Sequence, residues 1–257
     1  MRFAPAAGIS WDADPAGVSP SARPLPYADR PARSPGCAEK PTQLPECEGL
    51  PDETYKAMFD NLALACRHML DGPYGRALAP GCGISVLYGA PPPAIDLVMV
   101  SLQNHDCERP MFDPAGQPWP ERLVHADEAS DPFAFGARLR RVFAAHGLTR
   151  TLRERTLAIN AIYPDAPREE ADLWLHGDHA RGAWRRFSTT WTALIIEQVR
   201  PKAVLLLGRK ASVATRRKLK GVPVVEAMHF AAPAAGHDDA VYQGPFERLA
   251  RLLDAEP

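Results

Sequence analysis

Four short segments of the chain are apolar at nearly every position. They are rich in Val, Ile, Leu and Ala, and they comprise residues 95–100, 157–162, 203–207 and 222–227. Because they lack the polar alternation of a strand with one wet face, they are typical of strands buried on both faces. The intervening segments predict helices over 131–145, 184–199 and 211–219. The pattern therefore predicts an α/β fold, a three-layer α/β/α sandwich around a central, mostly parallel four-stranded sheet.

The two ends of the chain differ from each other. Residues 52–70 carry apolar side chains at helical spacing after an acidic first turn, which predicts an amphipathic helix, and residues 246–253 predict a closing core helix. Residues 1–51 hold about a third of the 27 prolines and show no apolar periodicity. We therefore expect a Pro-rich, disordered or loosely draped arm over residues 1–51 and one globular domain over residues 52–257.

Composition narrows the function classes. A formal net charge of −1 gives no global attraction for nucleic acid, so only a local basic surface could bind it. No apolar run reaches the roughly 18 residues of a membrane-spanning helix, and the N-terminus lacks the pattern of an export signal. The 5 cysteines form no C-x-x-C pair, which disfavours a zinc ribbon and a redox motif, and their odd number disfavours a disulfide scaffold. We expect a cytoplasmic protein with reduced thiols and no membrane partner.

Polar residues follow the apolar segments. Gln103, Asn104, His105 and Asp106 come shortly after the first, Asn160 lies within the second, and His229 comes soon after the last. Ligands of parallel α/β sheets bind beyond the carboxyl ends of the strands, so these groups are expected at one edge. A single histidine at a strand end is more often a surface group, and a single asparagine a turn former. Their combination favours a binding site.

The order and context of these residues resemble those of the uracil-DNA glycosylase superfamily over roughly residues 52–254. In that family a first motif, Gly-Gln-Asp-Pro-Tyr or Gly-x-Asn-Pro-Gly, follows an apolar strand, and the corresponding stretch here is Leu-Gln-Asn-His-Asp at 102–106. The segment RPMFDPAGQ supplies Phe112, LAINAIYP supplies Asn160, and WTALIIEQVRPKAVLLLGRKA is similar to a helix followed by a strand that ends in Leu-Gly-x-x-Ala. A final His-Pro-Ser corresponds to the chain's His-Phe-Ala at 229–231.

The resemblance implies removal of a damaged or deaminated pyrimidine from DNA. The base must leave the duplex, stack on an aromatic ring and be read by an amide, roles that fall to Phe112 and Asn160. A hydrogen-bond donor stabilises negative charge on the departing base, which is the expected role of His229. Asn104 is favoured for positioning water, with Asp106 as the second candidate. Gln103 takes the place of Asn104 if the register shifts by one residue, and His105 replaces the family's proline within the substrate-binding loop.

DNA binding also requires cations near the site. The basic segment that follows Gly208 indicates contacts with DNA phosphates from Arg209, Lys210, Arg216 and Arg217. The resemblance adds Phe230, which is the one large side chain of the loop that would enter the duplex. A solvated helix face is an equal alternative for the basic run. Further cations of this kind are Lys218, Lys220, Arg181, Arg185 and Arg186.

The chain also departs from the family. An asparagine at the water-positioning site supplies no charge, which lowers the expected rate. The cysteines do not fit the iron–sulfur pattern of the thermophile branch, so no metal and no cofactor are expected. We expect a monomer acting on single- or double-stranded DNA. The alternatives are a DNA- or base-binding protein that does not cleave, and an enzyme acting on a free nucleoside or nucleotide. The stretch LWLHGDHARG is interpreted as a polar loop rather than a metal site.

Overall fold

The computed structural model describes residues 52–78, 82–104, 123–128, 134–231 and 239–254, with the side chains of residues 52–56 left out. The arm expected over residues 1–51 lies outside the described residues. All four predicted strands are present, as β1 (Leu97–Ser101), β2 (Thr156–Asn160), β3 (Ala203–Leu207) and β4 (Val224–Ala227). They form an all-parallel sheet in the order β2-β1-β3-β4, which confirms the predicted α/β fold.

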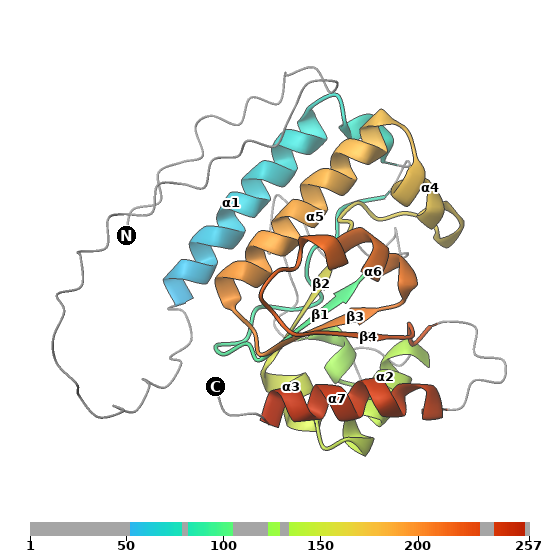
Figure 1. The fold of residues 1–257 in the computed structure, drawn as a ribbon. Helices are drawn as coiled ribbons and strands as arrows, with labels where there is room; N and C mark the ends of the chain where they lie inside the picture. Colours follow the sequence, from blue (N-terminus) through green and yellow to red (C-terminus); the bar gives the residue numbers. More distant parts are fainter. Residues whose placement is uncertain (1–51, 79–81, 105–122, 129–133, 232–238, 255–257) are drawn as a thin grey trace, which may run out of the picture. The chain divides into compact units, whose positions relative to one another are not determined.

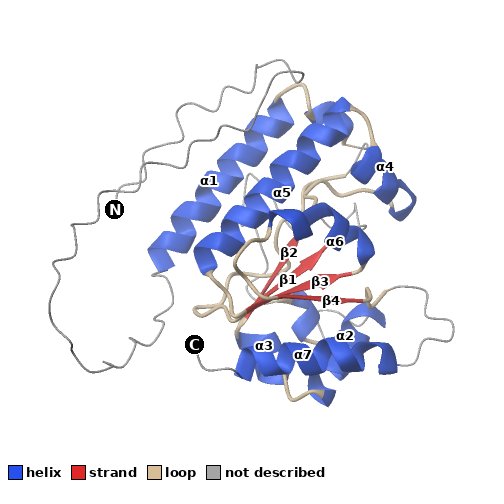
Figure 2. Cartoon of the chain, in the orientation of Figure 1, coloured by secondary structure: helices blue, strands red, loops and turns tan. Residues whose placement is uncertain are grey.

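Helices cover both faces of this sheet (Figure 1, Figure 2). One layer contains α1 (Asp52–Asp71), α4 (Ala171–His176), α5 (His179–Val199) and α6 (Arg209–Thr215). The other contains α2 (Ala134–Ala145), α3 (Thr149–Glu154) and α7 (Gln243–Asp254). Short 3-10 turns lie at η1 (Gly75–Ala77), η2 (Val124–Ala126), η3 (Arg168–Glu170), η4 (Arg216–Lys218) and η5 (Asp239–Tyr242).

Alternating side chains of the central strands supply two separate cores. In β1, Val98 and Val100 pack into the cluster that includes residues of α1 and α5. Leu97 and Met99 pack into the cluster that includes residues of α2 and α7. Successive side chains of a strand point to opposite faces, so an apolar residue is needed at each of positions 97–100 of β1. This explains why the strands lack polar alternation in the sequence.

The boundaries of several elements differ from the sequence prediction. The predicted strand over 222–227 begins at Val224, and the predicted helix over 211–219 is divided into α6 and the 3-10 turn η4. The helix α5 begins at His179, five residues before its predicted start at 184, and ends where Arg200 adopts a left-handed conformation (φ 47°) before Pro201. None of the helices in the described residues combines the length and apolar character that crossing a membrane requires.

The structure corrects the expectation of reduced thiols at one position. Cys82 is disulfide-bonded. Cys66, by contrast, is a free thiol buried in the core, and burial raises its pKa. Since the thiolate is the reactive form, Cys66 is a structural residue and not a nucleophile.

Candidate functional site

The ends of β1 and β2 bring two of the predicted site residues together. The two strands are in register so that Ser101 faces Asn160, and Asn104 follows three residues after Ser101. Both asparagines donate to Ser85: the Nδ2 of Asn104 to its Oγ at 3.2 Å, and the Nδ2 of Asn160 to its backbone oxygen at 3.0 Å. Ser85 therefore joins the residue expected to position water to the residue expected to read the base.

Asn160 is fully buried, and its amide is held on both sides. Its Oδ1 accepts hydrogen bonds from the Tyr88 hydroxyl at 2.8 Å and from the Ser101 Oγ at 2.7 Å. Burial raises the pKa of Tyr88 to about 12, so the phenol keeps its proton and remains a donor. An amide oxygen has two lone pairs, and both are used here. A base edge can thus reach this oxygen only if one hydroxyl releases it, whereas one N–H of the amide has no acceptor among the described residues.

Gln103 points to a different segment from Asn104. Its Nε2 donates to the backbone oxygen of Pro164, while its Oε1 is buried and accepts no hydrogen bond within the described part of the chain. The next residue after Pro164 is Asp165, which is fully buried and which the sequence interpretation missed. The backbone N–H of Ala166 donates to the backbone oxygen of Asn104 at 3.2 Å. The segment after β2 therefore packs directly behind the end of β1 and brings a buried carboxyl group to this edge.

His229 stands beyond β4 at the same edge of the sheet, two strands away from Asn104. Its Nδ1 accepts a hydrogen bond from the backbone N–H of Ala231 at 3.3 Å. An acceptor nitrogen carries no proton, so the neutral ring holds its proton on Nε2 and presents an N–H donor there. The ring is half-buried, and the backbone of His229 lies close to Gly208, which follows β3.

A row of rings connects the two sides of the site. Tyr88 lies 4.7 Å from His125, His125 lies 4.6 Å from Phe135, and Phe135 lies 5.2 Å from His229, measured between ring centroids. His125 and Phe135 are both half-buried. The sequence interpretation missed both residues, because neither follows a strand and no local pattern distinguishes them. The row provides an aromatic wall between Asn160 and His229.

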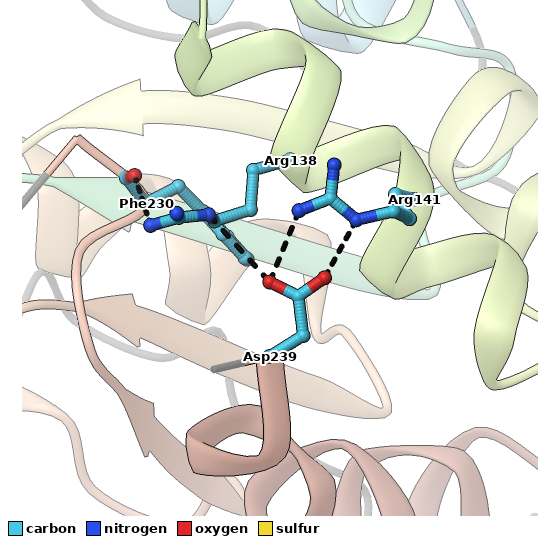
Figure 3. Close-up of polar contacts among 4 residues, drawn as sticks. All are labelled: Arg138, Arg141, Phe230 and Asp239. Atoms are coloured by element: carbon cyan, nitrogen blue, oxygen red, sulfur yellow. Dashed lines mark hydrogen bonds and ion pairs between the residues drawn. The ribbon is translucent and has the colours of Figure 1, made fainter. Parts of the chain in front are cut away.

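Arginines of α2 hold the segment that carries His229 (Figure 3). Arg138 donates to the backbone oxygen of Phe230 at 3.4 Å and lies 3.6 Å from the carboxylate of Asp239. Arg141 binds the same carboxylate through two hydrogen bonds, at 2.6 and 3.1 Å. The hydrogen bond to Arg141 is the main cause that lowers the pKa of Asp239. The backbone after His229 is thus tied to α2.

Phe230, expected to enter the duplex, is placed in the core by the structure. It is 2% exposed, and its ring stacks on Tyr242 at 4.7 Å and also packs against Phe135 and Phe246. A side chain in this position does not reach DNA without partial unfolding of the core. We therefore leave Phe230 out of the proposed DNA contacts.

The predicted DNA-binding cations fall into two groups. Lys210 pairs with Asp172 at 2.9 Å, and Arg216 pairs with Glu226 at 3.6 Å, so their charges are partly neutralised within the chain. Arg209 and Arg217 are exposed and make no ion pair with a described carboxylate. Three further predicted site residues, His105, Asp106 and Phe112, lie outside the described residues.

The stretch interpreted as a polar loop, residues 173–182, comprises the end of α4, a two-residue connection and the beginning of α5. Asp178 is the N-cap of this helix and accepts a hydrogen bond from the backbone N–H of Arg181 at 2.9 Å. The ring of His179 lies 5.8 Å from that of Tyr74. Within the described ranges, no three His, Cys, Asp or Glu side chains gather in a way that could hold a metal ion.

Two hollows of the described surface lie away from this edge. One, of about 560 Å³, is lined by Pro91–Pro93, Arg153 and Thr156, at the amino end of β2. The other, of about 410 Å³, follows the outer side of β4 and includes Val224 and Arg248. Both are open to solvent, and neither is lined by Asn104, Asn160 or His229, although Arg216 lines the second.

The carboxyl edge of the sheet therefore combines amides, an imidazole and an aromatic wall. This set can stack a planar heterocycle and hydrogen-bond its edge, and the imidazole N–H can stabilise negative charge on a ring oxygen. Comparison of the chain with protein-family models and with curated proteins gives no match.

Proposed function

We propose that the protein is a DNA glycosylase with a three-layer α/β/α fold of the uracil-DNA glycosylase type, and that it hydrolyses the N-glycosidic bond of uracil or a related damaged pyrimidine in DNA. The observation that carries the proposal is that Asn104, Asn160 and His229 stand at one edge of a parallel sheet in the order in which the family's motifs occur. This is the edge at which such sheets bind ligands.

Each residue has a role that its contacts support. The Nε2–H of His229 donates to the carbonyl oxygen on which charge develops as the base departs. Asn104 orients the attacking water through its amide, which Ser85 holds in place. Asn160 offers one amide N–H to the base, and the Tyr88–His125–Phe135 row supplies the surface on which the base stacks.

The test measures the release of free base from oligonucleotides that contain uracil, single-stranded and double-stranded. We expect wild type to leave abasic sites and His229→Ala to slow release about a hundredfold, as loss of one charge-stabilising donor does. Alanine keeps the Cβ atom that lies near Gly208, so the fold is preserved. The matched control is His176→Ala, since His176 is an exposed histidine at the end of α4. Equal rates for His229→Ala and wild type would exclude the proposed role of His229.

A second candidate is a protein that binds DNA or a base on the same scaffold without cleaving it. Two features favour it: the Oδ1 of Asn160 already accepts two hydrogen bonds, and the amide of Asn104 carries no charge. Neither group makes an interaction that is stronger in the transition state than in the ground state, and only such interactions accelerate a reaction. No base release from any oligonucleotide, together with retained binding, would identify this function and reject the glycosylase.

A further inference from the structure

Positive side chains gather where η4 packs against the middle of α5. The Nζ of Lys218 donates to the Oγ1 of Thr190 at 2.8 Å and to the backbone oxygen of Arg186 at 3.5 Å. The side chains of Arg185 and Arg186 lie close enough for their charges to act on Lys218. We call Arg185, Arg186 and Lys218 the α5–η4 cluster.

The three charges of this cluster are not compensated. None of them forms an ion pair with a carboxylate in the described part of the chain, whereas the neighbouring Lys210 and Arg216 each do. Partial burial, and then the charges of Arg185 and Arg186, lower the pKa of Lys218. Mutual repulsion of this kind is relieved when an anion binds between the cations.

The chemistry of the cluster fits a phosphate group. Guanidinium groups bind phosphate oxygens in pairs, and an ammonium group adds a point charge that Thr190 holds in position. Because the whole chain has a net charge of −1, a polyanion is attracted only by a local group of this kind. The cluster belongs to the helical layer beside α5, not to the strand ends that carry His229 and Asn160 (Figure 1).

We propose that the α5–η4 cluster binds backbone phosphates of a nucleic-acid strand, at a site additional to the one that reads the base. The proposal takes its ligand class from the proposed function. The phosphate site can exist whether or not the protein releases a base, because the proposal concerns only binding of the strand.

The test compares binding of a single-stranded oligonucleotide without damaged bases at several salt concentrations. Each phosphate contact contributes about 0.7 to the slope of log K against log salt for a single strand. We expect Lys218→Gln to lower the slope by about that amount and Lys218→Arg to restore it. Arg251→Gln is the matched control, since Arg251 is an exposed cation without a described carboxylate partner on α7, in the opposite helical layer. Thermal unfolding of each variant confirms that it is folded.

The outcomes separate this proposal from the proposed function. If the slope falls for Lys218→Gln and not for Arg251→Gln, the phosphate site stands even when wild type releases no base. Equal slopes for wild type and Lys218→Gln, or no binding of the strand, overturn it. Titration with inorganic phosphate and with a nucleoside monophosphate tests the other source of the same group. If Lys218→Gln weakens these ligands but leaves strand binding unchanged, the assignment to a nucleic-acid strand is overturned.

Discussion

At the scale of single residues, Gly208 connects backbone geometry to the proposed chemistry. It adopts φ 86°, a conformation that other residues rarely take, and a Cβ atom at this position would lie 3.1 Å from the Cβ of His229. Gly208→Ala therefore adds backbone strain of about 1–3 kcal/mol and also displaces the imidazole. We expect loss of stability together with a reduced rate of base release.

Gly221→Ala is the matched comparison for this effect. Gly221 has φ 72°, but a Cβ atom there would contact nothing within 4 Å. Unfolding by denaturant should show a loss of stability in both variants, larger in Gly208→Ala, whereas base release should fall only in Gly208→Ala. Equal rates in the two variants would mean that Gly208 has no part in placing His229.

Tyr88 gives a prediction about alkaline pH. Its pKa is about 12 in the folded chain, against 10.0 for an unperturbed tyrosine. At pH values between these two, the unfolded chain releases a proton that the folded chain keeps, so the free energy of unfolding falls as pH rises. We expect Tyr88→Phe to make this fall smaller by up to about 3 kcal/mol. Denaturant unfolding of wild type and Tyr88→Phe between these pH values measures the difference. If the free energy of unfolding falls equally with pH in both proteins, the raised pKa of Tyr88 is contradicted.

At the scale of elements, α5 depends on its cap. The carboxylate of Asp178 accepts a hydrogen bond from the backbone N–H of Arg181, and it also forms an ion pair with the guanidinium of Arg181 at 3.2 Å. We expect Asp178→Ala to lower the free energy of unfolding by about 1 kcal/mol, and Asp178→Ser to retain most of it, because serine also caps helices. A fall of the same size in both variants would show that the ion pair, and not the cap, provides the stabilisation.

The sequence pattern predicts the long and buried elements better than the short ones. The strands β1 to β4 and the helices α1, α2, α5 and α7 are present near their predicted positions, because apolar burial dictates their composition. The two six-residue helices α3 and α4 were not predicted, since so short a helix contains less than two full apolar repeats. The start of α5 was also missed, because Asp178 between two histidines has the composition of a loop as well as of a cap.

The candidate site was predicted only in part, for a related reason. The strand ends identify Asn104, Asn160 and His229, because the topology of a parallel sheet places such residues at one edge. Ser85 contacts the site from a loop and His125 contacts it from the 3-10 turn η2, and neither contact leaves a periodic signal in the sequence. The burial of Phe230 depends on packing against α7, which a strand-end position does not reveal.

At the scale of the whole molecule, the sheet separates two cores, and its carboxyl edge carries the candidate site. Residues of β1 and β3 contribute to both cores, so removing either helical layer would expose apolar side chains of these strands. The position of His229 depends on one of these layers, since α2 holds the backbone that follows it through Arg138 and Asp239. The position of His229, and with it the proposed function, therefore depends on the packing of α2 and α7.

The burial of Phe230 predicts a preference for single-stranded DNA. Removing a base from a duplex costs a few kcal/mol, and a side chain inserted into the duplex offsets part of this cost. Phe230 is in the core, and the residues that follow it, 231–236, are Ala, Pro and Gly, which are too small to replace it. The cost of extruding the base is therefore not offset, and each 1.36 kcal/mol of such cost slows the reaction tenfold. We expect uracil release from a single strand to be at least about tenfold faster than from a duplex.

Single-turnover rates on strands of identical sequence measure this preference. A duplex with uracil opposite guanine should give an intermediate rate, because a mismatched base costs less to extrude. Phe230→Ala should destabilise the fold by about 3–5 kcal/mol, as removal of a buried phenylalanine does. It should not change the ratio of the single-strand and duplex rates in the fraction that remains folded. A selective loss of the duplex rate in Phe230→Ala would instead show that this ring leaves the core and enters DNA.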